Sequence, residues 1–184
     1  ITAVILTGLG KFIFMDWLDY RFAYILMAIL LWIGYIVFRY RKDNKIIEYW
    51  GLHKKNFRRT FLELLPIAVL LVIGFILYGN SQGTNVLNWT ILPILLLYPI
   101  WGIIQQFIMI GILASNLRDI ESVKLSNYLI VFLTALLFSV VHYPFNLLII
   151  ATFFLAIVYT TLYFKGRNLI VFGIYHGWLG ALFF

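Results

Sequence analysis

The strongest constraint on the fold of this chain is a long stretch without charge, since no Asp, Glu, Lys or Arg occurs in residues 64–117. A helix of roughly 20 residues crosses the hydrocarbon core of a bilayer, so this stretch has room for more than one crossing. The whole chain is 64% hydrophobic and 11% charged, whereas a soluble domain is about half apolar and a quarter charged. The alternation of polar and apolar residues that is typical of an outer-membrane barrel does not occur. We therefore predict an all-α, polytopic transmembrane helix bundle.

The apolar segments predict about seven spans in a single transmembrane domain that covers residues 1–184. These spans lie near residues 1–15, 22–38, 66–78, 89–114, 125–142, 147–164 and 168–184. The loops at 39–59, 116–124 and 165–167 hold nearly all Lys and Arg, so we place them in the cytoplasm and the loops at 16–21, 79–90 and 143–146 outside. We expect a multi-pass protein of a bacterial inner (plasma) membrane. The sequence starts at Ile1 and stops in an apolar run, so both ends are open to truncation.

The formal net charge of +7 is concentrated in residues 39–65, which we interpret as a basic cytoplasmic loop followed by an amphipathic helix. In residues 46–65, Phe57 and Phe61 recur at helical spacing opposite Lys and Arg, which predicts a helix at the membrane interface. Basic residues between spans are typical of cytoplasmic orientation and attract anionic lipids. Membrane lipids are therefore the expected partners, and nucleic acid is not. The chain has no cysteine, which excludes disulfides and thiolate metal sites.

Four polar residues inside the predicted spans are candidates for a functional site. Gln105 and Gln106 lie in tandem within the uncharged stretch, about 100° apart on a helix, so at least one should face the protein interior. His142 and His176 are the ionisable residues of two later spans, and such residues usually face a cavity. They either donate hydrogen bonds that hold the bundle together or ligate a divalent metal or a water molecule. The sequence establishes no cofactor, and this metal is the one candidate.

Two further residues lie near His142. Asn146 follows it by one turn, beyond Pro144, and either forms hydrogen bonds at the mouth of the cavity or caps the next helix. Ser139 precedes His142 by one turn, and we expect its hydroxyl to bond its own backbone. No acidic partner accompanies this serine, so we do not interpret Ser139 and His142 as a nucleophile and its base.

The chain resembles the CPBP family of intramembrane proteases, also called the CAAX protease and bacteriocin-processing or Abi family. That family has three marks on separate transmembrane helices: Glu-Glu-x-x-x-Arg, Phe-x-x-x-His and His-x-x-x-Asn/Asp. In this chain they align with residues 105–111, 138–142 and 176–180, in the family's order and at its spacing. The resemblance is concentrated in a CPBP-like core at residues 90–184.

The resemblance implies a site in which the first glutamate activates the hydrolytic water and the histidines complete the centre. His142 and His176 match that pattern, and Gln105 stands where the first glutamate is expected. These three are the catalytic candidates by resemblance, and Gln106 is a further cavity residue. Gln105, Gln106, Ile110 and Gly180 depart from the family pattern. An amide does not act as a general base, because it has no group that titrates near neutral pH.

The way in which the first segment departs from the pattern indicates a site that has been neutralised as a unit. A glutamate and the arginine one turn later are both replaced, by Gln106 and Ile110, which removes an ion pair and leaves no charge unpaired. The nearest carboxylates belong to residues in loops or at helix ends, and none of them is positioned to replace the base. They include Glu63, Asp119 and Glu121.

Three functions remain open. The favoured hypothesis is an inactive CPBP-like protein whose polar cavity binds a lipid or prenyl ligand or a transmembrane segment of a partner. The second is an active CAAX-type endopeptidase in which His142 and His176 hold a metal and Gln105 orients water. The third is a structural subunit of a larger membrane complex, suggested by the small size of the chain and its lack of a soluble domain.

Overall fold

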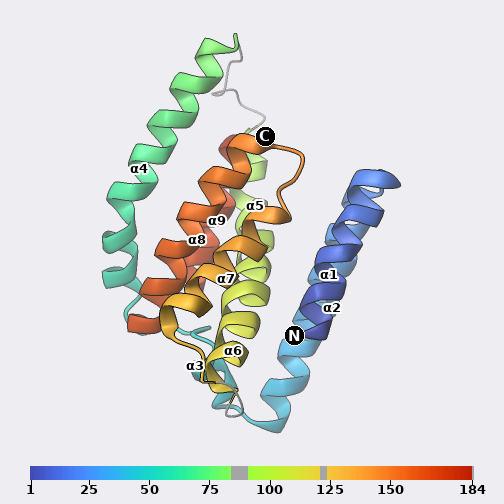
Figure 1. Ribbon diagram of the computed structural model, residues 1–184, viewed down its shortest axis with the longest axis vertical. Coiled ribbons are helices and arrows are strands. Elements are labelled where there is room, and N and C mark those ends of the chain that lie inside the picture. The colour runs from blue at the N-terminus through green and yellow to red at the C-terminus, as the bar shows by residue number, and fades with distance from the viewer. Residues whose placement is uncertain (84–90, 121–123, 184) are drawn as a thin grey trace.

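The computed structural model describes residues 1–83, 91–120 and 124–183, and these fold entirely into helices and their connections. Two segments, η1 and η2, are wound as π-helices, and the rest are α-helices. In chain order the elements are α1 (Thr2–Gly10), η1 (Lys11–Trp17), α2 (Arg21–Lys42), α3 (Ile46–Tyr49), α4 (Phe57–Ser81), α5 (Ile91–Gln106), η2 (Phe107–Ala114), α6 (Ser115–Asp119), α7 (Asn127–Val140), α8 (Asn146–Gly166) and α9 (Leu169–Phe183) (Figure 1). The prediction of an all-α bundle is confirmed.

Four of the helical stretches are long and apolar enough to cross a membrane: α2, α4, α8 and the continuous stretch Ile91–Asp119. The helix α7 and residues Leu169–Leu182 of α9 are apolar but shorter. The consecutive segments α1 and η1 form one arm of a hairpin, and α2, which runs beside them, forms the other arm (Figure 1). The chain is therefore an integral membrane protein whose apolar helices correspond to the predicted segments.

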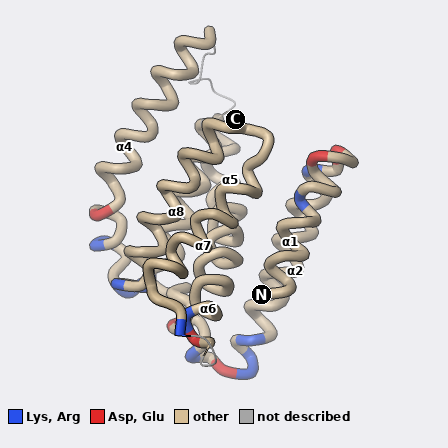
Figure 2. Tube along the Cα trace, in the orientation of Figure 1, with Lys and Arg blue, Asp and Glu red and all other residues tan. Residues whose placement is uncertain are grey.

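In Figure 2 the charged residues gather at the lower end of the bundle, along the first turns of α4 and at the tip of the hairpin between η1 and α2. The described parts of the three basic loops meet at one end, near α3, α6 and the turn between α8 and α9. Residues 84–90 and 121–123, which belong to two of the predicted loops, lie outside the described residues. The predicted orientation puts these three loops on one side of a membrane, so they are required to lie at the same end of the bundle.

The predicted amphipathic helix at 46–65 is in two pieces, because the chain turns sharply after α3. Gly51 and Asn56 both have positive φ, +76° and +57°, and α4 begins only at Phe57. A Cβ on Gly51 would overlap the Arg167 carbonyl, and the Gly51 carbonyl accepts a 2.9 Å bond from the Leu169 amide. The α8–α9 turn thus clamps this loop, a long-range contact that a helical pattern does not reveal.

Side chains reinforce the same clamp at the end of the bundle that carries the basic loops. The Arg167 guanidinium donates to the Tyr49 carbonyl at 2.7 Å and lies over the Tyr49 ring at 4.7 Å. The Tyr49 hydroxyl donates to the Asp119 carboxylate. Burial raises the pKa of the Tyr49 hydroxyl to about 12, and the bond to Asp119 acts in the same direction. This cluster is a structural connection between three elements that are far apart in sequence.

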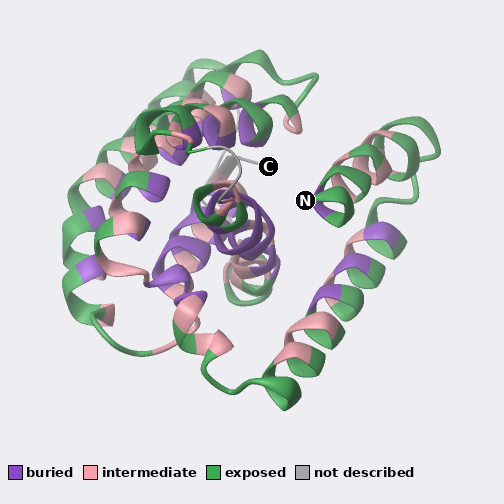
Figure 3. Cartoon of the chain, turned by 60° about the horizontal axis from the view of Figure 1, so that its bottom comes forward, coloured by how far each residue is buried: buried purple, intermediate pink, exposed green. Residues whose placement is uncertain are grey.

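The core lies along α5, η2 and α9, and Figure 3 shows the buried residues gathered in the middle of the bundle. All eight residues of η2 are buried, whereas α2 and α4 bury few residues and present large apolar side chains outward. Apolar outward faces are what a lipid environment accepts at no cost. A π-helical segment inside a long helix often marks a functional region, and η2 begins directly after the two glutamines.

Candidate functional site

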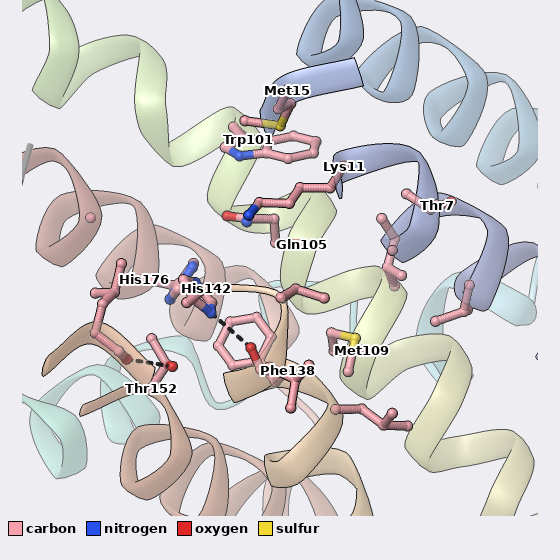
Figure 4. Close-up of a pocket in the computed structure, with 18 of the residues that line it drawn as sticks. Thr7, Lys11, Met15, Trp101, Gln105, Met109, Phe138, His142, Thr152 and His176 are labelled. Atoms are coloured by element: carbon pink, nitrogen blue, oxygen red, sulfur yellow. Dashed lines mark hydrogen bonds between the residues drawn. The ribbon is translucent and has the colours of Figure 1, made fainter. Parts of the chain in front are cut away.

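A cavity of about 670 Å³ separates the α1–η1–α2 hairpin from the core helices. Most of its lining is apolar, and its polar lining comes from both sides. The hairpin contributes Thr7, Lys11, Asp16 and Arg21, and the core contributes Gln105, His142, Thr152 and His176 (Figure 4). A ligand pocket in this size range, apolar with a few polar groups, is typical of small-molecule binding sites.

The structure separates the two tandem glutamines. Gln105 is half-buried and lines the cavity, and its side chain lies beside Lys11 in Figure 4. Gln106 is 1% exposed, is not among the lining residues, and its Nε2 has no hydrogen-bond partner in the described part of the chain. The two side chains diverge because consecutive helical residues point about 100° apart. We expected both glutamines to lie in the cavity wall, and only Gln105 does.

His142 follows the last turn of α7, where its ring is fixed by its own helix. Its Nδ1 is 2.7 Å from the Phe138 carbonyl oxygen. A carbonyl can only accept, so Nδ1 carries the proton and Nε2 keeps its lone pair. The histidine therefore offers an acceptor or ligand atom, and a metal-ligating histidine commonly makes the same backbone bond through its other nitrogen.

His176 is 6% exposed and lines the same cavity from α9. Its ring centroid is 6.1 Å from that of His142, and the Phe138 ring lies 5.0 Å from both. The Nδ1 atom of His176 is buried and has no hydrogen-bond partner within the described ranges. A buried polar atom without a partner costs about 1–3 kcal/mol, and because this atom has almost no accessible surface, a ligand in the cavity reaches it only if the ring shifts.

The residues present supply two imidazoles and one amide oxygen as metal ligands. Catalytic zinc sites use three protein ligands, and residues 1–83, 91–120 and 124–183 hold no group of three His, Cys, Asp or Glu that could bind a metal ion. The metal assignment for His142 and His176 stays a prediction. If a divalent ion binds, these two imidazoles hold it, with the Gln105 amide oxygen on the same cavity wall as the candidate third ligand.

The carboxylates considered from the sequence are engaged elsewhere. Glu63 accepts a 2.8 Å ion pair from Arg59, Asp119 accepts from the Tyr49 hydroxyl, and Glu121 lies outside the described residues. Asn146 is the exposed first residue of α8 and does not line the cavity. No side-chain cap bond is made at the start of α8, so neither expected role of Asn146 is seen. The proline turn before α8 directs this residue away from the site.

Sequence reasoning missed a pair of charged residues, Lys11 and Asp16, that lines the cavity. The Lys11 ammonium lies 2.6 Å from the Asp16 carboxylate and 2.7 Å from the Tyr143 carbonyl oxygen, 132 residues away. The second bond ties η1 to the turn that carries His142. The available signal was that Lys11 is the one charged residue in the first 15, because a lone charge in an apolar segment needs a partner.

A second missed feature is the glycine seam, formed by Gly102, Gly173 and Gly177, that joins α5 to α9. A Cβ on Gly177 would lie 2.5 Å from the Pro99 Cα, and one on Gly102 would lie 2.6 Å from the Gly177 nitrogen. Gly173 and Gly177 have the small-x-x-x-small spacing that lets membrane helices approach closely. Because His176 directly precedes Gly177, the seam sets the distance between His176 and the Gln105 wall.

Comparison with known proteins identifies a family. The model of the family described as Type II CAAX prenyl endopeptidase Rce1-like matches residues 87–182, a little over half of the chain. The matched range contains Gln105, His142 and His176, but not Lys11 and Asp16. Neither the comparison with curated proteins nor that with solved structures gave a match.

Proposed function

Because the chain belongs to the Type II CAAX prenyl endopeptidase Rce1-like family, we propose that it keeps an intramembrane cavity of that family as a neutral binding site and lacks peptidase activity. We place it in a bacterial inner membrane, with lipids or the transmembrane segment of a partner as its binding partners. The resemblance to the CPBP family, the basic cytoplasmic loops and the outward apolar faces of α2 and α4 support this placement.

The proposal rests on one observation, which is that the residue at position 105 of the cavity wall is a glutamine and not a glutamate. This residue faces the same cavity as His142 and His176, at the position where the family pattern has the glutamate that activates water. An amide neither takes up nor releases a proton near neutral pH, so it cannot serve as the general base. Asp16 is the carboxylate that lines the cavity, and Lys11 holds it in an ion pair at 2.6 Å.

The residues at the other two changed positions support the same conclusion. Gln106 and Ile110 are each 1% exposed, so a glutamate and an arginine there would form a fully buried ion pair. Such a pair is costly to desolvate, and removing one partner alone destabilises a protein by about 3–5 kcal/mol. Replacement of both by neutral residues avoids that cost. The first motif has therefore lost its charges together, as expected for a site released from catalysis.

A divergent endopeptidase is the second candidate, and the position of Asp16 favours it. This carboxylate and the Nε2 of His142 belong to the same cavity, so both are acceptors for water that enters it. For Asp16 to act as a base, Lys11 would have to release it. Loss of the Lys11–Asp16 ion pair is thus the structural condition that separates the second candidate from the first.

The test restores the motif and measures cleavage of a farnesylated CAAX-motif peptide in proteoliposomes. We compare the wild type with Gln105→Glu and with the triple variant Gln105→Glu, Gln106→Glu, Ile110→Arg. Our proposal predicts no cleavage by the wild type and cleavage by a restored variant, which His176→Ala then abolishes.

If the triple variant misfolds, the single variant Gln105→Glu still gives a result. Gln105 is half-buried and faces the cavity, where a carboxylate can be hydrated. Cleavage by the wild type that is lost in His176→Ala would overturn the proposal. Cleavage by the wild type that is also lost in Asp16→Asn would establish the divergent endopeptidase instead.

A further inference from the structure

The cavity has a polar outer part and an apolar inner part along the membrane normal. Lys11 contacts the Tyr143 carbonyl in the turn at 141–144 and lines the cavity there with Asp16 and His142. The segment η2 lines the cavity with Ile108, Met109 and Leu113, and it continues into α6 at the end that carries the basic loops (Figure 1). Figure 4 shows Lys11, Gln105, His142 and His176 gathered in one part of the cavity. A molecule that fills this space therefore has one polar end and one apolar end. Its polar end lies in the outer half of the bundle.

Apart from the Lys11–Asp16 ion pair, the polar groups around the head position are uncharged, and together they can both donate and accept. The Gln105 amide offers two N–H donors and a carbonyl acceptor, and the Nε2 lone pair of His142 offers an acceptor. His176 is 6% exposed and lines the cavity; its Nδ1 atom is buried without a partner in the described residues, so the ring must shift to present this nitrogen to the head. A hydroxyl, which is one donor and two acceptors, satisfies such a set. An alkane would leave every one of these groups unpaired.

The charges of the lining are already balanced. Lys11 pairs with Asp16 at 2.6 Å, and Arg21 pairs with Asp19 at 3.1 Å. The described lining holds no other charged side chain. A ligand with a net charge would therefore be desolvated without a free counter-ion, at a cost of several kcal/mol. An uncharged head group avoids this cost.

We propose that the cavity binds one uncharged single-chain amphiphile, with its hydroxyl head at Gln105, His142 and His176 and its chain along α1 and η2. The cavity volume of about 670 Å³ lies within the range of sites that enclose a single small ligand. This inference rests on the proposed function, because a resident ligand presupposes a binding cavity that does not turn over a peptide.

The experiment uses four photoreactive probes that share one hexadecyl chain with a diazirine near its end. The head is a hydroxyl, a sulfonate, a trimethylammonium or a hydrogen atom. Each probe is irradiated with the full chain in nanodiscs, and mass spectrometry measures both the extent of labelling and the labelled peptides. We compare the wild type with Gln105→Leu and with the matched variant Gln106→Leu. The second variant makes the same change one residue away, outside the cavity lining.

The expected result is labelling by the hydroxyl probe at least fivefold above the other three probes. The label should lie on α1 and η2, should fall at least threefold in Gln105→Leu and should be unchanged in Gln106→Leu. Stronger labelling by the sulfonate or trimethylammonium probe would overturn the inference, as would an equal effect of the two leucine variants. His176→Phe keeps an aromatic ring but removes both ring nitrogens, and we expect the same loss of labelling in this second test.

Failure of this inference and failure of the proposed function give different results. If the head-group preference is absent while the wild type still fails to cleave the farnesylated peptide, only the ligand class is wrong. If the wild type cleaves the peptide and His176→Ala does not, the proposed function is wrong whatever the probes show.

Discussion

Replacing Gly177 by alanine should separate α9 from α5, because the added methyl group has no space between the two helices. Its Cβ would lie 2.5 Å from the Pro99 Cα, 2.7 Å from the Pro99 nitrogen and 2.9 Å from the Tyr98 carbonyl carbon. All three are backbone atoms and cannot rotate aside. Carbon atoms pack at about 3.5–4.0 Å, so the helices must part by about 1 Å.

Overpacking of this kind costs about 1–3 kcal/mol, and each kcal/mol corresponds to about 2–4 °C of Tm in a chain of this size. We therefore expect Gly177→Ala to lower the Tm of the detergent-solubilised protein by several degrees. The cavity should suffer as well, because His176 adjoins the substitution and moves with α9. Labelling by the hydroxyl probe is the readout of this displacement.

Gly34→Ala is the matched control, since Gly34 lies inside α2 and an added Cβ meets nothing within 4 Å. Alanine in a helix interior is favoured over glycine by about 0.5–1 kcal/mol, so the control should be as stable as the wild type or slightly more stable. If Gly177→Ala melts at the same temperature as Gly34→Ala, the two helices are not in the close contact described, and the reasoning is wrong.

Three further predictions concern the site and its surroundings. Metal analysis of the purified wild type should find less than one equivalent of divalent metal, unchanged in His142→Ala and His176→Ala; a stoichiometric metal lost in both variants would show a metal centre. Lys11→Met should lower the free energy of unfolding by about 1 kcal/mol, because it removes a partly buried ion pair. The exposed Arg21→Gln should change it by less than about 0.5 kcal/mol, and equal effects in thermal unfolding would contradict the assigned contacts. Gln106→Leu removes a buried amide whose Nε2 has no partner in the described residues, so Tm should stay or rise; a loss above about 1 kcal/mol would show a hidden partner.

The sequence was sufficient for the features that depend on composition and local pattern. Long uncharged segments fixed the helical membrane class, and the costly polar residues Gln105, His142 and His176 were recognisable as residues that must face inward. The structure places all three on one cavity. Their roles in catalysis, binding or metal ligation stay predictions, because geometry alone does not decide among them.

The features that pattern could not supply are contacts between distant segments. Tandem glutamines point about 100° apart, but the sequence does not say which one meets the cavity. The bond from Lys11 to Tyr143 joins residues 132 apart, and the clamp on Gly51 comes from the α8–α9 turn. Each of these depends on how the helices are arranged in three dimensions, which periodicity does not encode.

The seam glycines show a signal that was present in the sequence and not used. Gly173 and Gly177 flank His176 at the spacing of a close helix contact, so the third motif carries a packing element as well as a histidine. Their partner Gly102 lies three residues before Gln105. The same contact that brings the two helices together therefore brings the amide and the imidazole to one cavity.

The measurement that tests the central claim most directly is the turnover of the farnesylated peptide by the wild type, set against the double variant His142→Ala, His176→Ala. Both proteins are reconstituted at equal density in proteoliposomes, and the cleaved C-terminal tripeptide is quantified by mass spectrometry. We predict that the two proteins release the tripeptide at the same background rate, because Gln105 supplies no base. Release by the wild type at ten or more times the rate of the double variant would contradict the claim.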